Sequence, residues 1–183
     1  MRAASVSSFG GPDNIKICND VPIPEITDTN QMLIDLRCAG VNPVDTVILA
    51  GKFDLNKSLP LCNGIDLAGV IGSAVTHLKV GDRVWFYTHD GSIGEVAVAT
   101  CAFPLANGLS FSEGACLGLS FSIAYRTIFT KGHINSCDRV PIHGASGGVG
   151  LASCHLSAFA CASLVVGTAG SQEGLDVVRR YTV

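Results

Sequence analysis

Short apolar stretches separated by turn-forming residues fill the first part of the chain. The turns are rich in glycine, proline and short polar residues, as in Gly10-Gly11-Pro12, Asn42-Pro43 and Gly81-Asp82. Met32–Cys38 alternates between apolar and polar side chains, which is typical of a half-buried strand. Leu67–Ile71 and Arg83–Tyr87 are rich in β-forming residues, which predicts buried strands. We therefore predict an all-β unit over residues 1–115, built as a small barrel or sandwich.

The pattern changes at Ser110. This serine lies three residues before Glu113, which is the spacing of a capping box, in which each side chain accepts the other residue's backbone N–H. An apolar stretch then continues to Phe129. We expect helical structure to begin at this point.

Residues 139–168 have the pattern of a β-α-β unit. Arg139–His143 and Leu164–Thr168 are typical of strands, Leu151–Ala160 of a helix that is apolar on nearly all faces, and Gly144–Gly150 of a turn. The predicted fold class is α/β with a preceding β domain. Residues 116–183 form the start of a doubly wound domain, and an incomplete one, because such a domain has two βαβαβ halves.

Composition indicates a globular chain with excess apolar surface. Of its 183 residues, 48% are hydrophobic and 15% are charged, and the mean hydropathy is +0.41. A missing segment that covers apolar faces would explain this excess. No apolar run approaches the ~18 residues of a membrane-spanning helix, and no secretory signal is evident. We expect a cytoplasmic protein with no membrane partner.

Cysteine usage and charge exclude several classes of site. The eight cysteines are scattered without a C-x-x-C pair, so we interpret them as reduced thiols and predict neither disulfides nor a zinc site. The net charge of −3 and the pI near 5.9 do not favour binding to nucleic acid, which requires neutralisation of phosphates.

The turn after the predicted strand Arg139–His143 resembles a dinucleotide fingerprint, with the spacing A-x-G-x-x-G at residues 145, 147 and 150. Glycine at 147 lets the backbone approach a pyrophosphate, and glycine at 150 lets the helix pack against the strand. The free N–H groups of the helix attract the anion, and a serine hydroxyl adds a donor. The candidate cofactor-binding residues here are Ser146, Gly147, Gly148, Val149 and Gly150. A tight connection without a ligand is the alternative.

The end of the second predicted strand indicates which cofactor is bound. NAD-specific sites place an acid there, about 20 residues after the glycines, to hold the ribose 2′-hydroxyl. Here the stretch is Gly167–Ser171, and the first carboxylate is Glu173. This uncharged strand end has room for a 2′-phosphate and favours NADPH. Ser171 and the amide of Gly170 are candidate contacts for that phosphate, and a simple turn is the alternative for each.

Several motifs of one family occur in order along nearly the whole chain. They are Phe9–Pro12, Ala39–Thr46, Gly64–Ile71, Gly81–Val84, Ala124–Arg126, the glycine-rich turn and Gly167–Gly170. Together they resemble the amino-terminal part of the quinone oxidoreductase, or zeta-crystallin, branch of the zinc-free medium-chain dehydrogenase/reductase family. The resemblance implies a GroES-like β barrel, the substrate and catalytic domain at residues 1–115, followed by an incomplete Rossmann domain that binds NADPH.

The resemblance also implies reduction of a quinone or conjugated enone by hydride transfer without a metal. Zinc-dependent relatives have a cysteine and a Gly-His-Glu motif where this chain has Asn42 and Asn63–Asp66, and we interpret the flanking Cys38 and Cys62 as structural thiols. Asn42 is the candidate donor to the substrate oxygen; the alternative is a turn in which its side chain bonds its own backbone. Asp45 is the candidate that orients Asn42 or the cofactor ribose; a helix-start carboxylate is the alternative.

Departures from the family pattern leave a second interpretation open. The family usually has tyrosine at Val47 and threonine at Ile123, and Pro141 lies within the first Rossmann strand, where an N–H is normally needed. The alternative is a truncated or diverged, crystallin-like relative without catalysis. Family analogy adds homo-oligomerisation of a full-length chain and, in some relatives, RNA binding. We expect the 183 residues alone not to turn over NADPH at the rate of full-length relatives.

Overall fold

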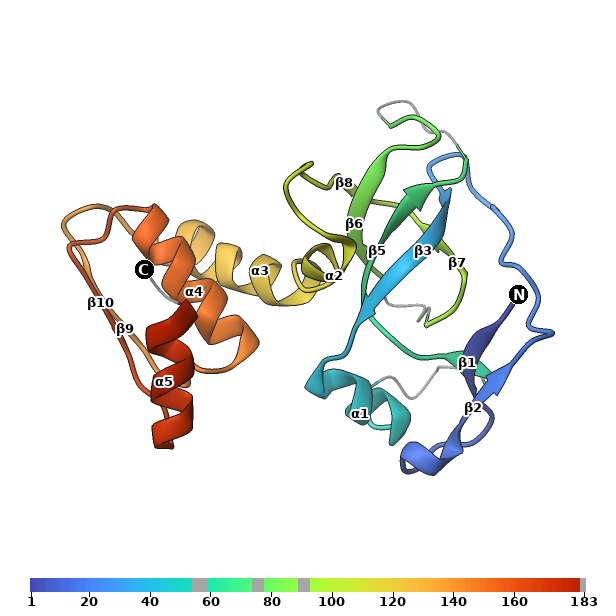
Figure 1. Cartoon of the computed structure of the whole chain (residues 1–183), viewed down its shortest axis with the longest axis horizontal. Coiled ribbons are helices and arrows are strands. Elements are labelled where there is room, and N and C mark those ends of the chain that lie inside the picture. Colours follow the sequence, from blue (N-terminus) through green and yellow to red (C-terminus); the bar gives the residue numbers. More distant parts are fainter. Residues whose placement is uncertain (54–58, 74–77, 89–92, 182–183) are drawn as a thin grey trace. The chain divides into compact units, whose positions relative to one another are not determined.

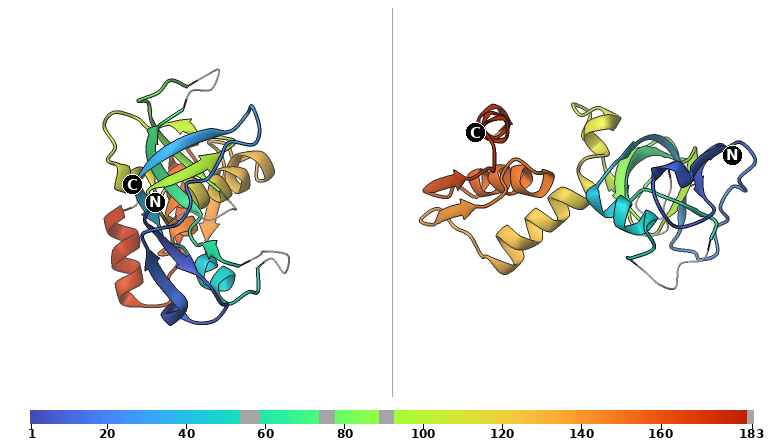
Figure 2. Two further views of the ribbon diagram at one scale, coloured as in Figure 1. Left: turned by 90° about the vertical axis from the view of Figure 1, so that its right-hand side faces the viewer. Right: turned by 90° about the horizontal axis from the view of Figure 1, so that it is seen from below.

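The computed structural model describes residues 1–53, 59–73, 78–88 and 93–181. The chain divides into two compact units, Met1–Gly118 and Leu119–Val183. The first unit is built mainly of strands and the second combines helices with two strands (Figures 1 and 2). A β unit followed by an α/β unit is the predicted order.

The first unit contains two antiparallel sheets. The larger has the strand order β7 (Val96–Ala99), β3 (Met32–Gly40), β5 (Asp66–Ile71), β6 (Arg83–Tyr87) and β8 (Phe103–Pro104). The smaller has the order β2 (Ile15–Cys18), β1 (Ala3–Val6) and β4 (Leu61–Cys62). Three short helices accompany them: η1 (Pro12–Asn14), α1 (Pro43–Leu49) and α2 (Phe111–Gly114). Among the described residues these strands form two sheets, without complete closure into a barrel.

The core of the first unit lies against the larger sheet. Met32 and Ile34 of β3 are completely buried and alternate with more exposed residues, which confirms the predicted half-buried strand. Of the two strands predicted to be buried, β5 is buried except at Val70, whereas in β6 only Val84 and Phe86 are buried and Tyr87 is 43% exposed. Side chains alternate across a strand, so the apolar residues of β6 serve both faces of the sheet.

Helix α1 corrects the prediction that residues 1–115 are all-β. The sequence places Asn42-Pro43 in a turn, but Pro43 is the first residue of α1. Proline is well suited to that position, since its φ angle is already helical and its missing N–H would have no partner there. Helix α1 positions Asp45, and Ile48 and Leu49 anchor it in the core.

The predicted start of helical structure at Ser110 is confirmed. Ser110 Oγ accepts the Glu113 N–H at 3.2 Å, and the Glu113 carboxylate accepts the Ser110 N–H at 2.7 Å. Hydrogen bonds from Ser110 also lower the pKa of Glu113. Helical structure continues in α3 (Gly118–Tyr125) and the π-helical segment η2 (Arg126–Lys131). No helix in the described parts of the chain is long and apolar enough to cross a membrane.

The second unit contains the predicted β-α-β arrangement. Strands β9 (Arg139–Ile142) and β10 (Leu164–Gly167) are parallel and adjacent, with Val140 opposite Val165. Helix α4 (Gly148–Phe159) connects them and packs on both, and α5 (Gln172–Tyr181) follows β10. A small core forms between strands and helices, from Val140, Ile142, Ala145 and Cys154.

The start of α4 differs from expectation. The helix begins at Gly148, three residues earlier than predicted. The prediction assigned Gly148 and Gly150 to the turn because glycine lowers helix propensity. Pro141 lies within β9, as predicted, and pairs with Val166 of β10.

Candidate functional site

The glycine-rich turn joins β9 to α4, and a hydrogen bond to Thr168 links it to the chain directly after β10. Gly144 adopts a φ of 64°, in the left-handed region that favours glycine. Ala145 is completely buried, and its N–H donates to the Thr168 carbonyl at 2.8 Å. Gly147 is the N-cap of α4, and its N–H donates to the Gly144 carbonyl at 3.1 Å. The turn is therefore a rigid connection that leads directly into the helix.

Gly150 and Gly147 are glycines for different reasons. A Cβ atom at Gly150 would collide with the Gly144 carbonyl oxygen and lie 2.6 Å from Ala145 Cα, so the fold itself requires glycine there. A Cβ at Gly147 would meet only the Gly144 oxygen, at 3.6 Å, which is ordinary contact. Nothing in the described chain requires glycine at 147. Glycine at 147 is what the dinucleotide fingerprint predicts, where the backbone leaves room for a pyrophosphate.

The first turn of α4 is open to an anion. Gly147, Gly148 and Val149 are exposed, and Gly147 has no side chain that can cap the first N–H groups of the helix. The helix is 12 residues long, so its dipole adds positive potential at the same end. A pyrophosphate fits this donor set, because its oxygens accept several backbone N–H groups at once.

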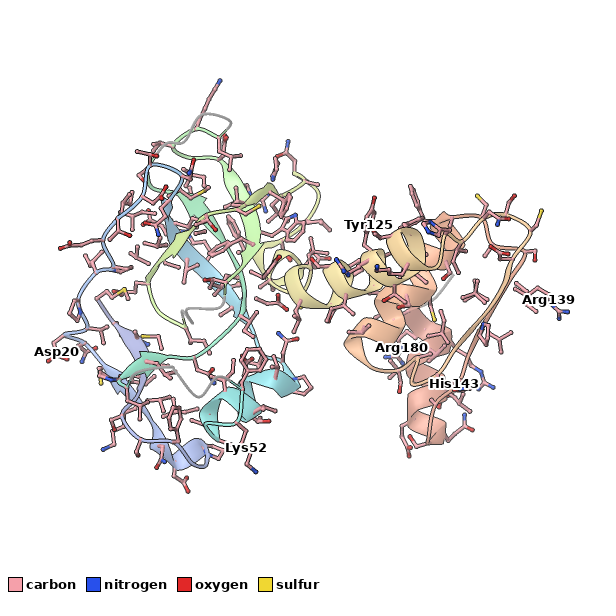
Figure 3. The ribbon with its side chains drawn as sticks, turned by 180° about the vertical axis from the view of Figure 1, so that it is seen from behind. Asp20, Lys52, Tyr125, Arg139, His143 and Arg180 are labelled. Atoms are coloured by element: carbon pink, nitrogen blue, oxygen red, sulfur yellow. The ribbon has the colours of Figure 1, made fainter. Side chains whose placement is uncertain are left out.

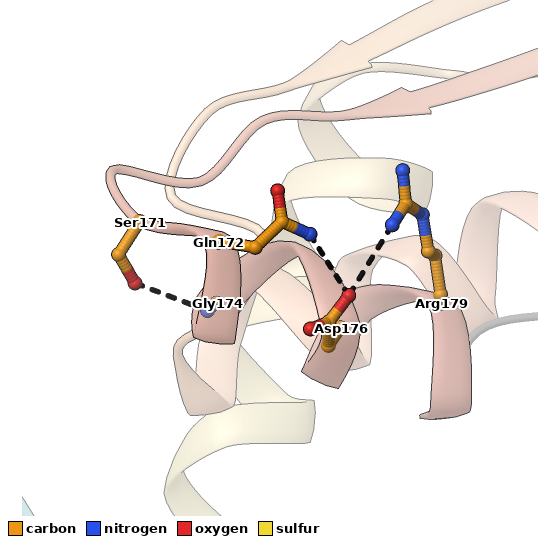
Figure 4. A network of polar contacts seen from close by, with 5 residues as sticks. All are labelled: Ser171, Gln172, Gly174, Asp176 and Arg179. Carbon is orange, nitrogen blue, oxygen red and sulfur yellow. Dashed lines mark hydrogen bonds and ion pairs between the residues drawn. The ribbon is translucent and has the colours of Figure 1, made fainter.

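The end of β10 lies beside this turn. A Cβ at Gly174, in the first turn of α5, would be 3.1 Å from Ser146 Oγ, so Ser146 packs against α5. Ser171 Oγ accepts the Gly174 N–H at 3.1 Å and caps α5 (Figure 4), which favours the turn interpretation of this serine. A Cβ at Gly170 would contact nothing within 4 Å. The structure thus brings the two predicted groups of cofactor-binding residues together in one unit.

His143 is a residue of this region that the sequence analysis did not select. It follows β9 (Figure 3), and its Nδ1 lies 3.0 Å from the Thr168 hydroxyl at the end of β10. The signal that was available is its position, since the last residue of a strand before a glycine-rich turn faces the carboxyl edge of the sheet, where ligands bind.

Asn42 and Asp45 lie in the first unit, at the start of α1. The Asn42 side chain donates from Nδ2 to Asp66 Oδ2 at 2.9 Å, and Asn42 also forms a capping box with Asp45 at the start of α1, so a contact with a distant side chain and a local one are both present. The Asp45 carboxylate accepts the Asn42 N–H at 2.7 Å, as a helix-start carboxylate does. Asp66, on β5, is 2% exposed, and the sequence analysis did not predict that it contacts Asn42.

Asp45 is buried at 4% exposure. Burial raises the pKa of its carboxyl, and the hydrogen bond from the Asn42 N–H opposes that effect. Its Oδ1 has no hydrogen-bond partner among the described residues, and the same is true of Asn63 Oδ1. Asn63 Nδ2 donates to the Asp45 carbonyl at 3.1 Å. Asn42, Asp45, Asn63 and Asp66 thus form a polar cluster in which two buried oxygens, Asp45 Oδ1 and Asn63 Oδ1, lack a hydrogen-bond partner among the described residues.

Replacing Asp45 with asparagine should flatten the pH dependence of stability. Because the folded-state pKa is raised, the folded protein holds this proton more tightly than the unfolded chain, so stability falls as pH rises from about 3.8 through the folded value. Asp45→Asn removes that titration. Urea unfolding at about pH 4 and about pH 7, followed by fluorescence of Trp85, the single tryptophan, measures it. Asp20→Asn, at an exposed position, is the control; parallel behaviour of Asp45→Asn and wild type would contradict the expectation.

Asn42, Asn63 and Asp66 belong to this polar cluster, and they lie in the two stretches where zinc-dependent relatives have their metal-ligand motifs. Within the described residues, no three histidine, cysteine, aspartate or glutamate side chains gather closely enough to hold a metal ion. Cys38 and Cys62 are partly buried free thiols, and burial, with a smaller contribution from Cys18, raises the pKa of Cys62. Val47 and Ile123, which replace the family's hydroxyl residues, are 39% and 43% exposed.

Comparison with known proteins agrees with the resemblance. The alcohol dehydrogenase GroES-like domain family matches residues 28–125. Quinone oxidoreductases from Lama guanicoe and Homo sapiens are 42% and 39% identical over 184 residues, which cover 97% of this chain and 55% of each relative. The chain therefore spans about half the length of these curated relatives.

Solved structures show the same architecture. Escherichia coli quinone oxidoreductase in complex with NADPH has a TM-score of 0.84 and 25% identity, and covers 100% of this chain with 57% of its own. The human synaptic vesicle membrane protein VAT-1 homolog-like protein has a TM-score of 0.88 and 26% identity, and the match covers 100% of this chain and 60% of the VAT-1 homolog-like chain. The predicted fold class is confirmed. The chain belongs to the alcohol dehydrogenase GroES-like domain family, and its similarity to curated quinone oxidoreductases agrees with the predicted branch.

Proposed function

We propose that this chain binds NADPH at its glycine-rich turn and takes part in the metal-free reduction of a quinone or conjugated enone. The observation that carries the proposal is the space in front of Gly147, which the chain does not use, beside the uncapped N–H groups of α4. The quinone oxidoreductase of E. coli, solved with NADPH, supports the choice of cofactor. In this assignment residues 116–183 bind the cofactor and residues 1–115 bind the substrate.

The residues of the second unit have separate roles. The N–H groups of Gly148, Val149 and Gly150 bind the pyrophosphate, and the hydroxyl of Ser146 adds a donor at its edge. Gly170 and Ser171 lie where the adenosine ribose and its 2′-phosphate are bound. The cofactor supplies the hydride, and the chain supplies binding and orientation.

Asn42 is the proposed catalytic residue of the first unit. A carboxamide has two N–H donors, and one of them is bound to Asp66. The other is the proposed donor to the substrate oxygen, on which negative charge develops as hydride is accepted at carbon. A quinone or enone suits this arrangement, because conjugation spreads that charge and no metal is needed to polarise the carbonyl. Asp45 holds the backbone of Asn42 and acts through it.

A diverged relative without catalysis is the second candidate. It is favoured by Val47 and Ile123, which remove two hydroxyl groups that the family usually has. Such a protein would keep the cofactor site and lose turnover, so binding and activity have to be measured separately.

NADPH should bind more tightly than NADH, by about tenfold, because no acid follows β10 directly and the strand end accepts a 2′-phosphate. Isothermal titration of the purified chain with each cofactor measures this. Oxidation of NADPH with a simple quinone is then followed for the chain alone and for a chimera that carries the carboxyl-terminal part of a quinone oxidoreductase. We expect low turnover for the chain alone and a higher rate for the chimera, since the second half of a Rossmann domain holds the nicotinamide. Binding of neither cofactor would contradict the proposal.

We propose a cytoplasmic location, because scattered free cysteines are suited to a reducing compartment. Homo-oligomerisation of a full-length protein rests on family analogy, and RNA binding has no support in the net charge of −3.

A further inference from the structure

Three strands of the larger sheet place Tyr87 in line with the Asn42–Asp66 pair. Strands β3, β5 and β6 are adjacent (Figure 1), and Gly40, Asp66 and Tyr87 lie opposite one another across them. Opposed residues in an antiparallel sheet have their side chains on the same face, with Cβ atoms about 5 Å apart. Asn42 follows Gly40 by two residues, and its Nδ2 donates to Asp66 Oδ2 at 2.9 Å. Tyr87 is therefore the neighbour of that pair on the β6 side.

The backbone between α2 and α3 covers part of the same face. A Cβ at Gly118 would collide with Asp66 Oδ1 and lie 3.2 Å from Tyr87 Cβ. A Cβ at Gly40 would collide with the carbonyl oxygen of Ala115. Under this cover Asp66 is only 2% exposed, whereas Tyr87 is 43% exposed. The row that is buried at Asp66 thus reaches solvent at the Tyr87 side chain.

The exposed ring suits a flat ligand. Tyrosine presents a planar apolar ring, which packs favourably on another aromatic ring. A quinone is also planar, and its carbonyl oxygens project from the edge of its ring. The second N–H of the Asn42 carboxamide is the proposed donor to the substrate oxygen. One quinone can therefore accept a hydrogen bond from Asn42 and pack on Tyr87.

We infer that Tyr87 is a specificity-determining residue of the substrate site, whose ring packs on the ring of a quinone while Asn42 binds the quinone oxygen. The inference rests on the proposed function and narrows it from quinones and enones alike to planar cyclic quinones. An acyclic enone offers the oxygen without the ring, so it gains little from Tyr87. The hydroxyl of Tyr87 is not needed for this contact.

Trp85 allows the contact to be tested without turnover. It is the single tryptophan and lies two residues before Tyr87 on β6, so both side chains are on the same face. Quinones accept an electron from an excited indole, so a quinone bound at Tyr87 quenches the fluorescence of Trp85. Anthraquinone sulfonate is the probe, because both sides of its quinone ring are fused and cysteine thiols cannot add to it. The titration is done with NADP+ present, which cannot reduce the quinone.

Tyr87→Leu removes the ring, and Tyr87→Phe keeps it. We expect saturable quenching in wild type, an affinity roughly tenfold weaker in Tyr87→Leu, and an affinity within about twofold of wild type in Tyr87→Phe. Mesityl oxide, an acyclic enone, is measured by competition and should bind equally to wild type and Tyr87→Leu. Tyr181→Leu is the matched control, because it removes a tyrosine that is 55% exposed on α5, and it should bind both ligands as wild type does.

Equal binding of anthraquinone sulfonate by Tyr87→Leu and wild type would overturn the inference. Loss of affinity for both ligands in Tyr87→Leu would also overturn it, since it indicates a general disturbance of the first unit. Binding by Tyr87→Phe as weak as that by Tyr87→Leu would assign the contact to the hydroxyl and not to the ring. These three results leave the proposed function standing. A wild-type chain without saturable quenching contradicts the placement of the substrate in the first unit, and the inference with it.

Discussion

Replacing Gly150 with alanine should unfold the second unit while the first unit stays folded. The added Cβ would collide with the Gly144 carbonyl and lie 2.6 Å from Ala145 Cα, and both are backbone atoms that cannot rotate away. Ala145 is itself completely buried and bonded to Thr168, so the turn cannot move aside without breaking its link to β10. We expect a loss of more than about 3 kcal/mol, beyond that of most single substitutions.

Two signals separate the units in this experiment. Trp85, the single tryptophan, stacks on Phe103 in the first unit with ring centroids 4.7 Å apart, so its fluorescence reports that unit. Helix content by far-ultraviolet circular dichroism reports mainly the second unit, which holds α4, α5, η2 and nearly all of α3. Gly170→Ala is the control, because its Cβ would contact nothing within 4 Å. Retention of full helix content in Gly150→Ala would show that the turn adapts in a way we have not recognised.

Replacing Gly147 with valine should abolish cofactor binding at nearly unchanged stability. The branched side chain would fill the space that we assign to the pyrophosphate, in front of the α4 N–H groups. The chain itself has room for it, since a Cβ there lies 3.6 Å from its nearest neighbour. Loss of a favourable N-cap residue costs about 1 kcal/mol. Isothermal titration with NADPH and urea unfolding measure the two quantities separately.

Gly147 and Gly150 are expected to respond differently, because an added side chain would collide with the chain at Gly150 and not at Gly147. If Gly147→Val binds NADPH as wild type does, the anion does not approach this backbone and the cofactor site is wrongly placed. If it unfolds the second unit, position 147 serves packing, as position 150 does.

Sequence patterns predicted the parts of this fold that depend on neighbours along the chain. The capping box of Ser110 and Glu113 was predicted because both members lie within one turn of helix. The parallel β9-α4-β10 arrangement was predicted because apolar periodicity and glycine placement are local signals. Even there, the start of α4 was misplaced, because glycines at 148 and 150 lower helix propensity, while close packing against the Gly144 carbonyl requires glycine at 150.

Contacts between residues far apart in the chain were not accessible in this way. Asn42 bonds Asp66 across 24 positions, and the sequence assigned each to a motif without indicating that the two side chains meet. Ser146, in the glycine-rich turn, lies against the first turn of α5, where a Cβ at Gly174 would be 3.1 Å from Ser146 Oγ, and the sequence did not indicate that contact either. Local chain chemistry therefore set the elements and the glycine-rich turn. The tertiary structure decided which hydrogen-bond partners surround the candidate residues. It brings together strands and helices that are far apart in the sequence, and no periodicity along the chain indicates how close in space two such residues lie.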